Sequence, residues 1–237
     1  MAHQRMLAVA HRAGNTVAGL RAALTAGADL VEADVHLYRD ALEMRHSRAL
    51  GPHLYWERSS GIMRRRDVVV PELGEILAAA AGDPRLLLDL KGRSHTVAVR
   101  VAETLRTLCP GVPVAVCTKE WAMLEAFPPE MNVRRILSVA NSLQLARLRA
   151  RLRRERVDGV SIRLRLLTAP VVAELRHATD LVLAWSVETE AELAHAERLG
   201  VTGVISKNMV MVSRLAQRTR LAPVADADAG NAEVGPA

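Results

Sequence analysis

Short runs of apolar residues alternate with longer amphipathic stretches along the whole 237-residue chain. The short runs are rich in Val, Leu, Ile and Ala, which is typical of buried strands in a parallel sheet. They predict eight strands, at residues 6–10, 30–35, 86–90, 112–117, 133–138, 158–162, 181–186 and 202–206. Regular alternation of strands and helices indicates repeated βα units.

The stretches between these strands carry apolar residues at helical spacing. Val17, Leu20 and Leu24 are one such series, and Leu145, Leu148 and Leu152 are another. Eight strands with intervening helices favour one closed (β/α)8 TIM barrel over an open, doubly wound sheet. We expect this α/β barrel to form a single domain over residues 1–220.

Two segments depart from the βα rhythm. Residues 47–85 are too long for a simple connection, and we predict a long excursion between the second and third strands, made of a loop, a short VVVP segment and a helix near 72–81. The last residues, 221–237, are small, acidic and contain Pro and Gly. This composition predicts a disordered C-terminal tail.

Composition narrows the classes of partner. Half the residues are hydrophobic but only 3% are aromatic, so the core is aliphatic and an aromatic platform for stacking nucleic-acid bases is not expected. The formal net charge of +6 suits an anionic partner, although an arginine-rich composition also arises simply from a GC-rich genome. The arginines near 143–156 surround a leucine stripe, as on a solvated outer helix. We therefore expect a small anionic ligand and no nucleic acid.

The cysteines and the hydropathy pattern bear on location. Cys109 and Cys117 lack metal-ligand spacing, which favours free thiols in a reducing compartment. No leader pattern opens the chain, and no apolar stretch approaches the 18 or so residues of a membrane span. We expect a cytoplasmic protein without stable membrane insertion; its oligomeric state is not predicted.

Polar residues interrupt the apolar runs where the predicted strands end. His11 and Arg12 follow the first strand, and Glu32 and Asp34 lie two apart in the second. Asp89 and Lys91 likewise lie two apart at the end of the third strand. Arg163 and Trp185 lie at the ends of later strands. Arg163 could contact substrate if its side chain turns into the barrel mouth. TIM barrels carry their chemistry at the carboxyl ends of the strands. The pattern therefore predicts a site built mainly by the first three strands.

Three carboxylates from adjacent strands would repel one another unless a cation lies between them. Strand residues two apart face the same way, so Glu32 and Asp34 point together. Oxygen ligands favour a hard divalent cation, Mg²⁺ or Ca²⁺, and the lack of nearby cysteines makes zinc a poorer match. We therefore predict a divalent metal held by Glu32, Asp34 and Asp89.

Two histidines complete the candidate site. His11 ends the first strand, and His46 follows a short β extension predicted near 42–45. A lone histidine is more often structural, but two histidines beside a metal, with Arg12 and Lys91 nearby, suit acid and base catalysis on a phosphodiester.

These motifs resemble the glycerophosphodiester phosphodiesterase family, one of the phospholipase C-like phosphodiesterase barrels. The similar stretches are HR at 11–12, EAD at 32–34, His46, VPELGEIL, LLLDLKG, LAWSVET and RLGVTGVIS. They occur in the family's order and cover about residues 6–208.

The resemblance implies metal-dependent hydrolysis of small glycerophosphodiesters to an alcohol and glycerol 3-phosphate. It implies Glu32, Asp34 and Asp89 as metal ligands, and His11 and His46 as catalytic acid and base. Arg12, Lys91 and Trp185 would contact substrate, the first two by neutralising phosphate charge, although Trp185 could also be a packing residue at the barrel top.

The sequence departs from the family pattern at several positions. The loop after His11–Arg12 is shortened, so that Asn15 follows Gly14 directly and the usual acidic residue before Asn-Thr is missing. Ser47 replaces the aspartate after the second histidine, and Asp89 replaces a glutamate. These changes leave substrate choice and metal geometry open.

Two other functions remain open from the sequence. One is a phospholipase D-like activity on lysophospholipids, which share the headgroup chemistry but require an apolar slot for the acyl chain. The other is a barrel that binds ligands without catalysis, although six costly polar groups would then be retained at the strand ends without a catalytic use.

Overall fold

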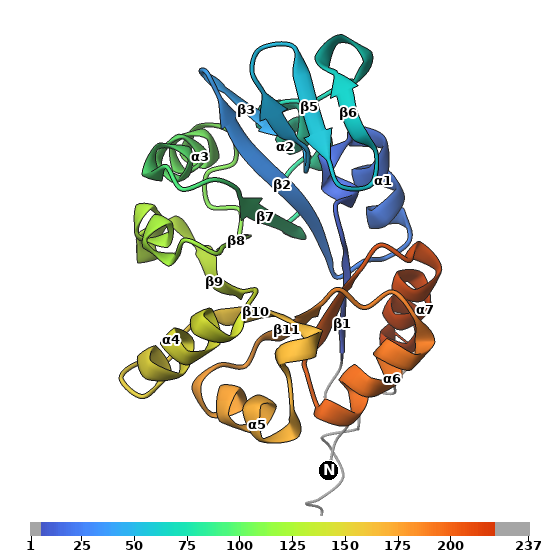
Figure 1. Ribbon diagram of the computed structural model, residues 1–237, viewed down its shortest axis with the longest axis vertical. Helices are drawn as coiled ribbons and strands as arrows, with labels where there is room; N and C mark the ends of the chain where they lie inside the picture. The colour runs from blue at the N-terminus through green and yellow to red at the C-terminus, as the bar shows by residue number, and fades with distance from the viewer. Residues whose placement is uncertain (1–5, 221–237) are drawn as a thin grey trace, which may run out of the picture.

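Eight parallel strands close into a barrel in the computed structural model, which describes residues 6–220 (Figure 1). The strands are β1 (Leu7–Ala10), β2 (Leu30–Tyr38), β7 (Leu86–Leu90), β8 (Val114–Thr118), β9 (Val133–Val139), β10 (Gly159–Arg163), β11 (Val182–Trp185) and β12 (Gly203–Ser206). Their order is β1-β12-β11-β10-β9-β8-β7-β2, and β1 also pairs with β2, which closes the ring. All eight predicted strands and the TIM barrel are confirmed; the predicted tail, 221–237, lies outside the described residues.

Seven α-helices surround the barrel in the described part of the chain. They are α1 (Val17–Thr25), α2 (Leu73–Ala80), α3 (His95–Leu108), α4 (Ser142–Leu152), α5 (Ala169–Ala178), α6 (Glu190–Leu199) and α7 (Met209–Arg220). Local signals start several of them: the Thr16 hydroxyl caps α1, Asn141 caps α4, and Thr189 with Glu192 forms a capping box on α6. Between β8 and β9 two 3₁₀ helices, η3 (Trp121–Ala126) and η4 (Pro129–Met131), take the place of an α-helix.

The excursion between β2 and β7 contains a sheet that the sequence did not predict. After β3 (Ala41–Met44), which pairs with the end of β2, the chain forms an antiparallel sheet of β4 (Arg48–Leu50), β5 (Leu54–Glu57) and β6 (Gly61–Arg64). The expectation of a loop here was wrong, because these strands are very short and carry mixed apolar and charged residues. The β extension, predicted at 42–45, and the helix, predicted at 72–81, are both present.

A buried charged cluster anchors this small sheet to the barrel. Tyr55 of β5 is completely buried, and its hydroxyl lies 3.4 Å from Glu43 Oε2 on β3. Arg45 Nε donates to the same oxygen at 2.6 Å, and the guanidinium groups of Arg45 and Arg65 lie 4.9 and 5.1 Å from the Tyr55 ring centre. Because the buried carboxylate is paired on several sides, the sheet has a fixed position relative to β2 and β3.

The inner face of the barrel changes from apolar to polar toward the carboxyl ends of the strands. Val9, Leu87 and Leu183 belong to a fully buried inner cluster. Glu32 lies in register with Leu87, and Asp34 lies one layer higher, in register with Asp89. Residues in register on parallel strands face the same side, so the site lies directly on this packed interior.

Candidate active site

Three carboxylates of β2 and β7, Glu32, Asp34 and Asp89, form a compact group at the barrel mouth, here called the acidic arc. One oxygen from each lies within 4.8 Å of the others. Glu32 is 4% exposed and Asp34 is fully buried, whereas Asp89 is half-buried. The structure thus brings together all three side chains that the sequence singled out as metal ligands.

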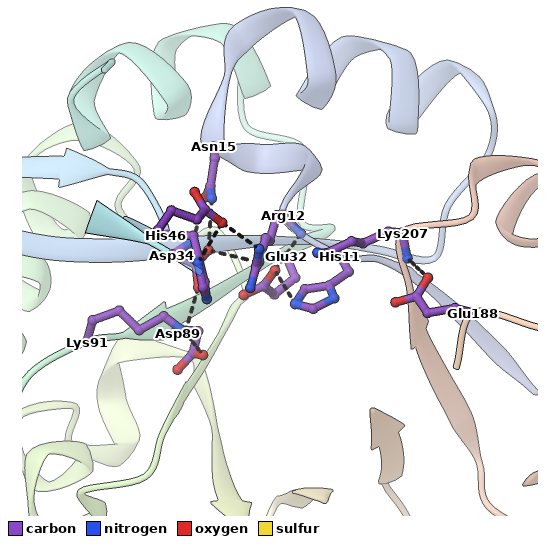
Figure 2. Close-up of polar contacts among 11 residues, drawn as sticks. His11, Arg12, Asn15, Glu32, Asp34, His46, Asp89, Lys91, Glu188 and Lys207 are labelled. Carbon is purple, nitrogen blue, oxygen red and sulfur yellow. Dashed lines mark hydrogen bonds and ion pairs between the residues drawn. The ribbon is translucent and has the colours of Figure 1, made fainter. Parts of the chain in front are cut away.

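Two cations lie against the acidic arc (Figure 2). Lys91 Nζ is 2.5 Å from Asp34 Oδ1 and also contacts the Asp89 carboxylate. Arg12 Nε lies 3.8 Å from Asp34 Oδ2, and the Arg12 backbone N–H donates to Glu32 Oε2 at 2.6 Å. Arg12 has the left-handed φ of +60°, an uncommon conformation for a residue with a Cβ. This turn aims both its amide and its side chain at the carboxylates.

The carboxylates of the acidic arc differ in their protonation. Burial raises the pKa of Glu32 well above its ordinary value, and the charge of Asp34 raises it further. Burial also works to raise the pKa of Asp34, but the Lys91 charge and hydrogen bonds from Lys91 and Asn15 outweigh it and lower that pKa to about 2. The same carboxylates raise the pKa of Lys91 despite its burial. Asp34 is therefore firmly ionised, and Glu32 is the carboxylate that gains most from an added cation.

The shortened loop after Arg12 still delivers an amide to the acidic arc. The Asn15 side chain donates to Asp34 Oδ2 at 2.8 Å and accepts from the Asp34 backbone N–H at 2.7 Å. Gly14 makes this approach possible, because a Cβ there would lie 2.7 Å from the Ala33 Cβ. Asn15 was not among the predicted site residues. The signal that could have indicated it is its position in the short loop between the first strand and the helix cap Thr16.

The two predicted catalytic histidines flank the acidic arc. His11 Nε2 lies 3.9 Å from Glu32 Oε2, and burial, followed by the Arg12 charge, lowers the pKa of His11 to about 3. His46 Nδ1 lies 3.0 Å from Glu57 Oε1, and burial lowers the pKa of His46 as well. At neutral pH both rings are therefore neutral in this structure and able to accept a proton.

Glu57 is a second residue of this site that the sequence did not indicate. It lies on β5 of the small sheet, and its Oε1 contacts both His46 Nδ1 at 3.0 Å and Arg12 Nη1 at 3.1 Å. The aspartate that the family pattern has next to the second histidine is Ser47 here, and Glu57 brings a carboxylate to the histidine from another element. The missing acid at position 47 was the signal that could have prompted a search for a replacement.

These side chains line a cavity of about 420 Å³ at the carboxyl ends of the strands. Trp185, at the end of β11, forms part of its wall, and Arg163, at the end of β10, also lines it. The Arg163 guanidinium lies 5.1 Å, and Lys119 Nζ 5.5 Å, from the Trp185 ring centre. The predicted substrate-binding residues Arg12, Lys91 and Trp185 therefore all face one cavity.

Comparison with known proteins gives matches in structure but not in sequence. No family model matches this sequence, and no curated protein matches it. A solved structure named putative glycerophosphoryl diester phosphodiesterase, from Silicibacter pomeroyi, has a TM-score of 0.73 at 17% identity, with 91% of this chain and 94% of that chain covered.

Two further solved structures are similar. A glycerophosphodiester phosphodiesterase from Thermotoga maritima has a TM-score of 0.71 at 18% identity, covering 90% of this chain and 100% of that one. An Oleispira antarctica phosphodiesterase, in complex with its product sn-glycerol-3-phosphate, has a TM-score of 0.70 at 20% identity, covering 89% and 96%. The resemblance found in the motifs is thus confirmed at the level of the fold: the chain has the barrel of these phosphodiesterase structures over about nine tenths of its length.

Proposed function

We propose that this protein is a metal-dependent phosphodiesterase that cleaves glycerophosphodiesters to an alcohol and glycerol 3-phosphate. The observation that carries the proposal is the acidic arc, held between two histidines and two cations at the mouth of the barrel. The Oleispira structure with sn-glycerol-3-phosphate shows a product of this class bound to a similar fold and supports the same assignment.

The residues present fit a hard divalent cation. Three carboxylate oxygens within 4.8 Å form an oxygen-only donor set. Burial, followed by the charge of Asp34, raises the pKa of Glu32, and an added cation would offset both effects. Glu32, Asp34 and Asp89 would hold Mg²⁺ or Ca²⁺. Such an ion, when bound, polarises a phosphoryl oxygen and offsets the charge of the diester.

The chain's own groups supply the remaining chemistry. Arg12 and Lys91 offset negative charge as it grows on the phosphoryl oxygens. Of His11 and His46, one accepts a proton from the attacking hydroxyl. The other, neutral in this structure, must first take up a proton from solvent, which the negative charge of the bound diester favours, and it then donates that proton to the leaving alcohol oxygen as its bond to phosphorus breaks. The attacking group is water or the neighbouring hydroxyl of the substrate glycerol. Trp185 forms the wall of the pocket that would contact the organic part of the substrate.

The small sheet supports lysophospholipids as a second candidate substrate. Trp56 and Ile62 face each other across β5 and β6 and are 40% and 65% exposed. This exposed apolar pair adjoins Glu57, so an acyl chain could lie on it while the headgroup enters the cavity.

In the described residues no helix has the length and apolar character needed to cross a membrane. The two cysteines are free, which supports a cytoplasmic site of action.

A direct assay tests the assignment. Purified protein is incubated with glycerophosphocholine, glycerophosphoinositol or lysophosphatidylcholine, with Mg²⁺ or Ca²⁺ and with EDTA, and the released glycerol 3-phosphate, lysophosphatidic acid and alcohol are measured. We expect metal-dependent release of glycerol 3-phosphate. We expect His11→Ala and His46→Ala each to lower kcat by about 10²-fold or more while the circular dichroism spectrum is unchanged.

The outcomes separate the three functions. Preferred cleavage of lysophosphatidylcholine would identify the phospholipase D-like activity. Turnover in EDTA would contradict the metal assignment, and absence of turnover on every diester would favour a binding barrel. Full activity of either histidine variant would refute the role of that histidine.

A further inference from the structure

Further basic side chains, besides Arg12 and Lys91, line the cavity. Lys119 follows β8, Arg163 ends β10 and Lys207 follows β12, and all three line the cavity. We call these three residues the cationic arc. Among residues 6–220, none of their side chains forms an ion pair. Glu188, beside Lys207, accepts from its backbone N–H at 2.9 Å rather than from its ammonium group.

The acids of the cavity are already engaged elsewhere. Asp34 and Asp89 contact Lys91, and Glu57 contacts Arg12 and His46. Figure 2 shows the Lys207 side chain extending from β12 toward His11, away from the carboxylate of Glu188. Within the described residues, the lysines and arginines that line the cavity therefore outnumber its carboxylates.

Two cations of this arc, Lys119 and Arg163, also act on one another. Burial lowers the pKa of Lys119, and the nearby charges of Lys91 and Arg163 lower it further, against the opposing effect of Asp89. Arg163 is half-buried, whereas Lys119 and Lys207 are exposed. Positive charge gathered around a concave site favours an anion there. A bound anion would relieve this repulsion.

The aromatic wall of the cavity, Trp185, disfavours a positively charged headgroup. A tryptophan face can bind a quaternary ammonium group such as choline. The Trp185 ring, however, already has Arg163 at 5.1 Å and Lys119 at 5.5 Å from its centre. A choline group at this wall would meet two positive charges.

We propose that Lys119, Arg163 and Lys207 form a second anion subsite, and that the preferred substrate is a glycerophosphodiester whose leaving alcohol carries a further phosphate. This inference rests on the proposed function, in which Arg12, Lys91 and a metal take the phosphate that is cleaved. A phosphate monoester has up to two negative charges and three acceptor oxygens, which suits a set of lysine and arginine donors.

Two substrates that differ by one phosphate test the subsite: glycerophosphoinositol and glycerophosphoinositol 4-phosphate. We expect the wild-type protein to have a kcat/KM at least about tenfold higher for the phosphorylated compound, a free-energy difference of about 1.4 kcal/mol. In the double variant Lys119→Gln/Arg163→Gln this ratio should fall about tenfold. Glycerophosphocholine should be the poorest of the three substrates.

A matched control removes the same amount of charge outside the cavity. Arg147 and Arg165 are exposed and do not line the cavity, so Arg147→Gln/Arg165→Gln should keep the wild-type ratio. Equal kcat/KM for both inositol compounds in the wild type, or an unchanged ratio in the Lys119/Arg163 variant, would overturn the subsite.

Binding measurements keep the subsite testable if neither compound is cleaved, an outcome that would count against the proposed function alone. Calorimetry in EDTA should then give a Kd about tenfold lower for the phosphorylated compound with the wild type. The difference should vanish in the Lys119→Gln/Arg163→Gln variant. Equal Kd values in the wild type would reject the second anion subsite.

Discussion

The two arcs of the cavity hold charge in opposite ways. In the acidic arc, on β2 and β7, carboxylates, cations and the Asn15 amide contact one another at hydrogen-bond distances. In the cationic arc, on β8, β10 and β12, no ion pair is formed within the described chain. A network that is paired internally fixes the geometry of its members, whereas unpaired charge remains available for a ligand. This difference is the basis for proposing the acidic arc as the reaction centre and the cationic arc as a selector of substrates.

The largest effect is expected from removing one charge of the acidic arc. Asp34→Asn keeps an oxygen that can accept from Asn15 but loses the negative charge that faces Lys91 and Arg12. We expect kcat/KM to fall by about 10²- to 10³-fold and divalent-metal binding, measured by calorimetry, to weaken.

The control for this variant is Asp180→Asn, since the Asp180 side chain is 94% exposed and lies just before β11, at the other end of the barrel. It should retain wild-type activity. An Asp34→Asn protein with wild-type activity and metal affinity would remove the basis for treating the acidic arc as the reaction centre.

An intermediate effect is expected at Glu57, which joins the small sheet to the reaction centre. Glu57→Gln keeps the size of the side chain but removes the charge shared by Arg12 and His46. We expect kcat to fall about tenfold. Because the Glu57 charge raises the pKa of His46, its loss should also shift the acidic limb of the pH profile to lower pH.

A purely structural role for Glu57 would lower the yield of folded protein without moving the pH profile. Glu130→Gln, at an exposed carboxylate of η4, serves as the matched control and should leave both kcat and the profile unchanged. An unshifted profile in Glu57→Gln would show that Glu57 does not tune His46.

The smallest effect is expected on thermal stability. We expect Glu32→Gln, a substitution in the proposed site, to raise the Tm of the metal-free protein. The folded pKa of Glu32 is raised above the ordinary 4.5, so the metal-free protein loses stability as pH rises from 4.5 through that raised value. Glu32→Gln has no charge to bury. We expect its metal-free form to have a Tm a few degrees above wild type at pH 7.5, since about 1 kcal/mol corresponds to roughly 2–4 °C at this size.

Metal and acid provide the checks on this stability difference. Millimolar Mg²⁺ should raise the Tm of wild type and leave that of Glu32→Gln nearly unchanged, and at pH 4 the two metal-free proteins should converge. A metal-free Glu32→Gln protein that is less stable than wild type at pH 7.5 would show that the Glu32 charge is already balanced inside the protein.

The sequence by itself determined the barrel and the end of the barrel at which the candidate site residues gather. Apolar runs at the strand period gave all eight strands, because burial of a parallel sheet on both faces leaves a strong local signal. The spacing of Glu32 and Asp34 placed both on one face, and the position of His11 and Arg12 at a strand end brought them to the same mouth. These are short-range properties that a single segment carries.

Only the tertiary structure decided which distant groups meet. Glu57 is 45 residues from Arg12 and 11 from His46, and the sheet that brings it to both leaves little periodic pattern in the sequence. A local stretch of sequence likewise does not show whether a lysine or arginine is ion-paired. That Lys119, Arg163 and Lys207 form no ion pair with residues 6–220 follows only from the three-dimensional contacts. Strand identity is set by local periodicity, whereas charge pairing depends on contacts between segments that are far apart in the chain.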